Sequence, residues 1–377
     1  MHTRLAKEMG LEFPIFAFTH CRDVAAAVSK AGGLGVLGVA GHSAAGLEAE
    51  LDWIEKGVGD KPDGVDLLLP AKYVGSDRSG GLEGGELDSR IPEEHRKFVD
   101  RILAEHDVPP LPPDQTARDQ FRVGFEEQRE VIELLFSRNI SLIASALGPP
   151  PAWMIEQGNA RGVRVAALAG TVEHARRHAE AGADLIIAQG YEAGGHTGDI
   201  STMVLVPEVV DAVAPLPVLA AGGIGGGRQL TAALALGAQG VWTGSVWLTT
   251  EEAETHPVVK EKFLKATSRD TLRSRSTTGK PARQLRSAWT DAWNDPDNPD
   301  PLPMPLQPRL AAEALARIAH HAHKNPGAAQ LINYYVGQIV GSMNHVKSVR
   351  SVMEEFAMEY ADTMARLDAW AEGEEAS

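Results

Sequence analysis

Short apolar runs alternate with alanine-rich segments along the first two thirds of the chain, and this alternation constrains the fold more than any other feature. The runs are apolar almost throughout, as is typical of parallel strands that are buried on both faces. They cover residues 13–18, 34–39, 64–70, 140–147, 163–170, 183–190, 217–223 and 240–247. Between these runs, apolar residues have helical spacing at 24–32, 173–182 and 227–237. Each of these segments ends in a Gly that suits a left-handed helix cap.

Eight strands that alternate with helices within about 250 residues predict an α/β fold, the (β/α)8 TIM barrel. A doubly wound parallel sheet is the competing architecture. We place the barrel at residues 1–250, with an insertion at about 71–117 after the third strand. The insertion is rich in Gly, Pro and charge, and we interpret it as a lid, a binding element or a disordered excursion. It lies on the face where barrel enzymes carry their active sites.

Residues 251–377 follow the eighth strand and predict a C-terminal subdomain, helical and extended, that packs on the barrel. A linker rich in Pro and Asp at 294–308 precedes helices at about 309–323 and 346–370. The apolar side chains of the last helix are expected to pack on the barrel, although they leave a homodimer open.

Charge and cysteine content exclude several classes of protein. The chain of 377 residues has a formal net charge of −15 and a single Cys, Cys21, which we expect to be buried or inert. An acidic balance argues against a nucleic-acid partner, and one Cys excludes an internal disulfide and a cysteine-built metal cage. No apolar run approaches the roughly 20 residues that span a bilayer, and the N-terminus shows no secretion signal. We expect a cytoplasmic enzyme without a metal.

The strongest local signal is the string AQGYEAGGHTG at 188–198, directly after a predicted strand. Glycines crowd this loop and let backbone N–H groups approach a ligand closely. His196 lies among them at the carboxyl end of a barrel strand, where barrel enzymes place catalytic residues. Because histidine titrates near neutral pH, we predict that His196 moves a proton during catalysis.

A second signal comes from the loops after the last two strands. Gly222, Gly223 and Gly225 follow one strand, and Thr243 to Ser245 end the other. In barrels these two loops often bind a phosphate through backbone N–H groups. The pair therefore predicts a small ligand that carries a phosphate.

Two further patterns are not interpreted as sites. Gly33, Gly35 and Gly38 match G-x-G-x-x-G, but they follow a helix and lie within a strand, so the context of a dinucleotide site is absent. The histidines at 320–323 share a helix without a complete ligand shell, and a solvated helix face is the favoured interpretation.

The strings AQGYEAGGHTG, VLAAGGIGGGRQL at 218–230 and GAQGVWTGSVW at 237–247 strongly resemble the nitronate monooxygenase family, formerly the 2-nitropropane dioxygenases. The resemblance extends through TLRSRSTTGKPARQLR at 271–286 to GQIVGSM at 337–343. It implies a (β/α)8 barrel that binds FMN. Relatives of this family include flavin-dependent enoyl-thioester reductases and quinone reductases.

The resemblance also implies a role for individual residues. The positions expected to contact the flavin ring are Ala17, Phe18, Thr19, Asp66, Gln189, Gly194 and Gly195. Those expected around the FMN phosphate are Gly222, Gly223, Trp242, Thr243, Gly244 and Ser245. His196 would lie beside the flavin, where it binds the nitro or carbonyl oxygen of the substrate or abstracts its α-proton.

Three positions depart from the usual pattern of the family. The first strand ends in Ala-Phe-Thr-His at 17–20 in place of Ala-Pro-Met and a longer loop. Asp66 stands where many members carry Asn, and an ionised Asp cannot donate a hydrogen bond to a flavin oxygen as an Asn can. The last strand ends in Trp-Thr-Gly-Ser at 242–245, which keeps the backbone donors but changes the side chains.

The implied reaction is the oxidation of alkyl nitronates, and of nitroalkanes, by dioxygen to a carbonyl compound and nitrite. One alternative is an NAD(P)H-dependent flavin reductase acting on an enoyl-thioester or a quinone, because it would use the same flavin site. A second alternative is a flavin-binding protein without turnover, against which the retained His196 argues.

Overall fold

The computed structural model describes residues 1–40, 42–69, 84–115 and 125–373. Eight parallel strands close into a barrel in the order in which they occur along the chain, so the predicted TIM barrel is confirmed. Each predicted apolar run overlaps one of them, and the two strands that pass the edge of a run, β1 and β3, do so by one residue. The strands are β1 (Ile15–Thr19), β2 (Leu34–Gly38), β3 (Asp63–Leu68), β4 (Leu142–Ala146), β5 (Arg164–Ala169), β6 (Leu185–Gln189), β8 (Val218–Ala221) and β9 (Gly240–Thr243).

Side chains along each strand alternate between the barrel interior and the surrounding helices. The interior is filled by buried apolar side chains, among them Phe16, Leu34, Leu142, Ile187 and Leu219. The short helix α1 (Arg4–Glu8) adds Leu5 and Ala6 to the same cluster. Since Thr3 donates to the carbonyl of Gln239, just before β9, α1 covers the amino end of the barrel and leaves the carboxyl end for a site.

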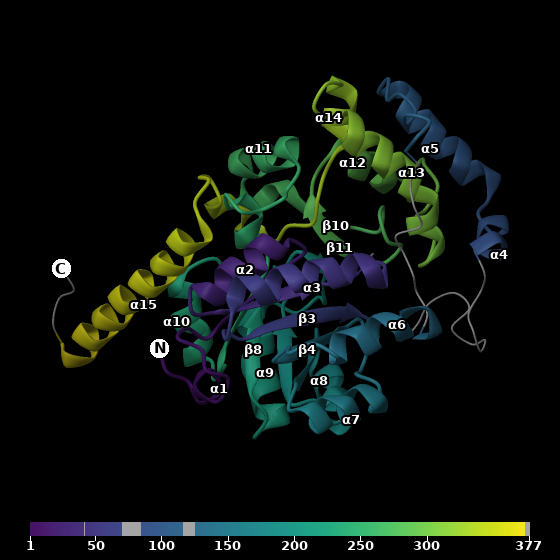
Figure 1. The fold of residues 1–377 in the computed structure, drawn as a ribbon. Coiled ribbons are helices and arrows are strands. Elements are labelled where there is room, and N and C mark those ends of the chain that lie inside the picture. Colours follow the sequence, from purple (N-terminus) through teal and green to yellow (C-terminus); the bar gives the residue numbers. More distant parts are fainter. Residues whose placement is uncertain (41, 70–83, 116–124, 374–377) are drawn as a thin grey trace.

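Helices cover the outside of the barrel, as Figure 1 shows. They are α2 (Arg22–Lys30), α3 (Ala44–Val58), α6 (Phe125–Phe136), α7 (Ala152–Arg161), α8 (Val172–Glu180), α9 (Thr202–Val213) and α10 (Gly227–Ala235). The predicted helices correspond to α2, α8 and α10. Gly35 lies in β2 at a very close approach to α2, because an added Cβ would lie 2.0 Å from the carbonyl oxygen of Ala25. The interpretation of this glycine pattern as part of a strand is confirmed.

A second group of helices lies beside the barrel and comes from two distant parts of the chain (Figure 1). Its members are α4 (Gly84–Ser89), α5 (Glu93–Glu105), α11 (Pro257–Lys265), α12 (Ala288–Asn294), α13 (Leu306–His321) and α14 (Pro326–Leu331). One apolar cluster joins them. Within it the rings of Phe98 in α5 and Trp293 in α12 meet edge to face at 4.7 Å.

The predicted insertion is therefore more ordered than its composition suggests. Within residues 84–115, α5 buries Phe98, Ile102 and Leu103 against the C-terminal helices, and its charged residues lie on the other face. The rest of the insertion falls largely outside the described residues. The domain boundary at residue 250 stays a prediction, because the insertion and the C-terminal region share one core.

The last helix, α15 (Val349–Glu372), packs its first half on the barrel, where Met353 and Phe356 join the cluster around α10 and α2. Its second half projects from the molecule (Figure 1) and carries exposed Leu367 and Trp370. The homodimer stays a prediction. In the described part of the chain, no helix combines the length and apolarity needed to cross a membrane.

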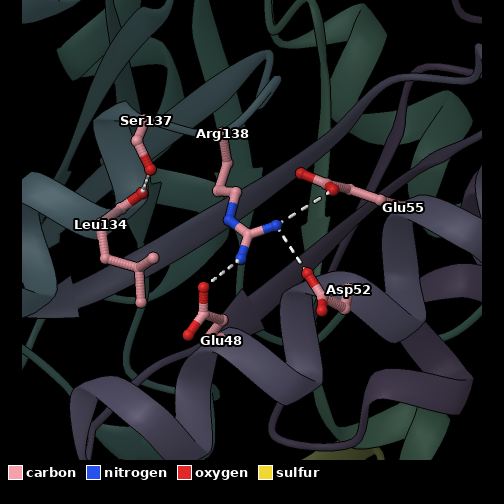
Figure 2. Close-up of polar contacts among 6 residues, drawn as sticks. All are labelled: Glu48, Asp52, Glu55, Leu134, Ser137 and Arg138. Carbon is pink, nitrogen blue, oxygen red and sulfur yellow. Dashed lines mark hydrogen bonds and ion pairs between the residues drawn. The ribbon is translucent and has the colours of Figure 1, made fainter.

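Arg138 fastens the chain where it returns to the barrel after the insertion. Its guanidinium lies among Glu48, Asp52 and Glu55 of α3, as Figure 2 shows, with the closest contact of 2.6 Å to Asp52. The Arg138 side chain is 16% exposed, so solvent screens this network only in part. The hydrogen bond to Asp52 and the neighbouring carboxylates raise the pKa of Arg138.

Candidate active site

The carboxyl end of the barrel gathers side chains from β1, β3, β6 and β9. Phe18 and Trp242 stack there with ring centroids 6.2 Å apart. Both belong to the cluster that fills the barrel interior. Gln189 follows Leu185 and Ile187 on the inward face of β6, and its amide makes no hydrogen bond to another described residue. These three predicted positions therefore meet inside the barrel mouth.

Other predicted positions on the same strands point outward. Ala17 is completely buried against the helix layer. Thr19 accepts a hydrogen bond from the backbone N–H of Cys21. The hydroxyl of Thr243 donates to the carbonyl of Phe16 at 3.2 Å, so its hydrogen is used within the fold. Only the backbone of these residues is left for a ligand.

The loops after β6 and β8 interlock through Thr202, at the start of α9. Its N–H and its hydroxyl both lie 2.9 Å from a carboxylate oxygen of Glu192, and the hydroxyl oxygen also lies 2.9 Å from the carbonyl of Gly222. Gly222 has φ +95°, and an added Cβ would lie 3.0 Å from the carbonyl oxygen of Gly190. The position therefore requires glycine, and Gly223 follows with φ +71°.

The loop after β9 is held from a distant segment. The hydroxyl of Ser245, at the start of η1 (Ser245–Thr249), accepts a hydrogen bond of 2.7 Å from the N–H of Gly337. Its own hydrogen is left to donate. Gly194 packs against the same segment, since an added Cβ would lie 2.9 Å from the nitrogen of Gly337. Gly195 and Gly244 have open space or ordinary contact at that place.

His196 is placed by strand pairing. It lies in the short strand β7 (Gly195–His196), which pairs with β11 (Ala282–Leu285), and β11 pairs with β10 (Thr271–Ser274). The ring Nδ1 lies 3.2 Å from the carbonyl of Pro281. Because a carbonyl can only accept, Nδ1 carries the hydrogen and Nε2 is left as an acceptor. Burial lowers the pKa of His196 to about 4, so the ring is neutral at pH 7.

Arg283 supports the loop that carries His196, a role that no motif in the sequence indicates. It is 2% exposed and donates to the carbonyl of Tyr191 from Nε at 3.1 Å and from Nη2 at 3.0 Å. Its guanidinium carbon lies 4.4 Å from the centre of the Tyr191 ring, and that of Arg273 lies 5.3 Å from it. Among the described residues, no carboxylate pairs with Arg283.

Lys280 lies near His196, and the structure also defines the surroundings of two further polar side chains, those of His20 and Tyr334. His20 directly follows β1, and its Nδ1 lies 3.1 Å from the carbonyl of Gly38. Tyr334 is 38% exposed, and burial raises its pKa. Burial lowers the pKa of Lys280, whose charge in turn helps to keep His196 neutral.

The positions not interpreted as sites have other contacts. The Nε2 of His321 lies 3.0 Å from the carbonyl of Pro110, which joins α13 to the insertion. Cys21 is buried as predicted, and its thiol donates to the carbonyl of Glu252.

A family model and curated relatives each match nearly the whole length of the chain. The family model described as Nitronate monooxygenase matches residues 3–359. A Mycobacterium tuberculosis protein named as a monooxygenase is 57% identical over 371 residues, covering 97% of this chain and 98% of that protein. The "Probable nitronate monooxygenase" of Staphylococcus saprophyticus is 30% identical, covering 92% and 95%.

Solved structures agree in fold. A nitroalkane oxidase from Streptomyces ansochromogenes has a TM-score of 0.77 at 27% identity, covering 96% of this chain and 99% of that one. FabK from Thermotoga maritima has a TM-score of 0.72 at 26% identity, covering 98% and 99%.

Proposed function

The chain belongs to the nitronate monooxygenase family, and we propose that it oxidises alkyl nitronates, and the nitroalkanes from which they form, with dioxygen on FMN. The chain is an oxidoreductase, and its family and its structural neighbours are flavin enzymes. The products we propose are a carbonyl compound and nitrite. The observation that carries this proposal is the neutral, fixed imidazole of His196 at the glycine-lined mouth of the barrel.

The residues at the barrel mouth fit FMN. Gly222 and Gly223 have positive φ, and Ser245 keeps a hydroxyl hydrogen to donate, as a phosphate requires. Gln189 offers an amide with no partner among the described residues, and Phe18 and Trp242 offer apolar surface for a ring. When bound, the flavin supplies the transfer of electrons from the nitronate to dioxygen.

The protein groups around His196 suit a substrate that is neutral or singly negative. The free Nε2 of His196 can accept the α-proton of a neutral nitroalkane, while Pro281 keeps the opposite nitrogen protonated. The ammonium of Lys280, whose charge acts on His196, can donate to the negative nitro oxygens of a nitronate. Orientation and proton transfer are thus assigned to this chain, and electron transfer to the cofactor.

An anaerobic mixing experiment tests the proposal. Purified protein with bound FMN is mixed with a nitronate in one cell and with NADH or NADPH in another, and the visible spectrum is recorded. We expect the nitronate to change the flavin spectrum and the nicotinamides to leave it unchanged. Nitrite should then form when dioxygen is admitted. If only a nicotinamide bleaches the flavin, the chain is a reductase and the proposal is wrong.

A further inference from the structure

Asp66 is a buried carboxyl group in the interior of the barrel. Its neighbours along β3, Val65 and Leu67, face outward into the cluster with α3 and α6, so Asp66 faces inward. It forms the last residue pair of β3 with β2, two further pairs follow it in the pairing with β4, and its side chain is 6% exposed. Its partners in register are Gly38 of β2 and Ala144 of β4, and neither carries an ionisable group.

The Asp66 carboxyl makes no hydrogen bond or ion pair with any other residue in the described ranges. The titratable groups that the structure places on the same wall are His20 and His42, at the ends of β1 and β2. The His20 ring lies over Gly38, because an added Cβ there would lie 2.7 Å from its Cε1. Burial lowers the pKa of His20, which favours the neutral form of this ring.

An ionised Asp66 carboxylate would be removed from solvent water inside the barrel and would have no positive charge beside it. Such a group takes up a proton rather than bear the cost of a buried charge. In agreement, burial raises the pKa of Asp66 well above its usual value. An aspartate at this position is unable to donate a hydrogen bond only in its ionised form. A protonated carboxyl is a donor, as an asparagine amide is.

We propose that Asp66 enters the cofactor site as a neutral carboxylic acid and donates its O–H to an acceptor atom of the flavin ring. The inference rests on the FMN site of the proposed function and specifies the protonation state of one residue in it. It makes two claims that can be separated: the carboxyl is protonated in the folded protein, and its hydrogen binds the cofactor.

Infrared spectroscopy of the flavin-free protein tests the first claim. We expect the carbonyl band of a protonated carboxyl at pH 8 in the wild type and its loss in Asp66→Asn. Asp63, at the other end of β3, is the matched control, since burial raises its pKa to about 7. Asp63 is therefore mostly ionised at pH 8, and Asp63→Asn should leave the band unchanged. If Asp66→Asn removes no band, the carboxyl is ionised and the proposal is overturned.

Binding of FMN, followed by its fluorescence, tests the second claim. Asp66→Asn keeps a donor and should bind FMN within about threefold of the wild type at pH 7. Asp66→Leu has nearly the same size but no donor, and should weaken binding about 5- to 10-fold. Wild-type affinity should fall as pH rises into the range where Asp66 ionises, whereas Asp66→Asn should show no such fall. Asp63→Asn should behave as the wild type.

Wild-type affinity in Asp66→Leu, or the same pH dependence in Asp66→Asn and the wild type, would overturn the proposal. Thermal unfolding of each flavin-free variant shows whether it is folded. None of these measurements uses turnover of a nitronate. If they succeed and nitronate is not oxidised, the proposed function fails alone; a protein that binds no FMN overturns both.

Discussion

The loops after β6 and β8 meet at the mouth of the barrel, and different interactions hold each of them in its conformation. The loop after β8 depends on its own backbone, because Gly222 and Gly223 adopt positive φ within a few residues of the strand. The loop after β6 depends on residues far away in the chain. Its strand β7 pairs with β11, and Arg283 holds the carbonyl of Tyr191 across 92 positions of sequence.

Because the two loops are held differently, substitutions in them should have different effects. A substitution in the glycine loop alters local backbone conformation, and with it the place of the phosphate. A substitution in β11 removes hydrogen bonds that join the C-terminal region to the barrel, so it should affect stability and turnover together. The four predictions below test this separation, from the largest expected effect to the smallest.

Replacing the imidazole should have the largest effect on turnover. His196→Asn removes the proton acceptor, and we expect turnover of neutral nitroalkanes to fall about 100-fold or more. Preformed nitronates need no deprotonation and should lose less. FMN content should be unchanged, because the phosphate loops lie on other strands. Steady-state kinetics with both substrates measures this, and equal turnover in the variant would remove His196 from the mechanism.

Removing the remote support should cost stability as well as activity. Arg283→Met leaves the carbonyl of Tyr191 without its donors, and we expect the free energy of unfolding to fall by about 2–3 kcal/mol. The matched control is Arg286→Met, on an arginine that is 66% exposed and pairs with Asp291. That change should stay within about 0.5 kcal/mol. Denaturant unfolding measures both, and equal losses would contradict the role assigned to Arg283.

A change in the glycine loop should act mainly on the cofactor. Gly222→Ala forces a Cβ into a space 3.0 Å from the carbonyl oxygen of Gly190, at φ +95°. We expect FMN affinity to fall about tenfold, measured by fluorescence titration. Gly162→Ala is the control, because Gly162 has φ +70° in the left-handed region with nothing within 4 Å and lies at the end of α7. The control variant should lose about 1 kcal/mol of stability and keep its affinity for FMN. An equal loss of FMN affinity in the control would contradict the role assigned to Gly222.

At neutral pH the ionisation of His196 should have the smallest effect on stability, and this effect should grow as pH falls. Burial lowers the pKa of His196 from 6.5 to about 4, so between these values the unfolded chain binds more protons than the folded one. The free energy of unfolding therefore falls as pH falls from about 6.5 to about 4. Thermal unfolding of His196→Asn should show a shallower fall in that window. Identical slopes in the two proteins would mean that the ring is solvated.

The described fold follows the sequence closely where burial is local. Each of the eight strands matches its predicted run to within one residue at either edge or lies inside it, because a strand buried on both faces is apolar along most of its length. Helix α5 was missed because the Gly, Pro and charge of the surrounding insertion hid its apolar face, which only the C-terminal helices cover. The glycines of the β8 loop were noticed because positive φ leaves a residue signature.

The sequence by itself determined the barrel and the positions of the loops at its carboxyl end, since periodicity and glycine placement are properties of neighbouring residues. Only the tertiary structure decided what supports His196 and which protonation state Asp66 takes. Both depend on groups that lie far apart along the chain. Arg283 reaches Tyr191 only once β11 has paired with β7, and Asp66 is cut off from water only once the barrel has closed.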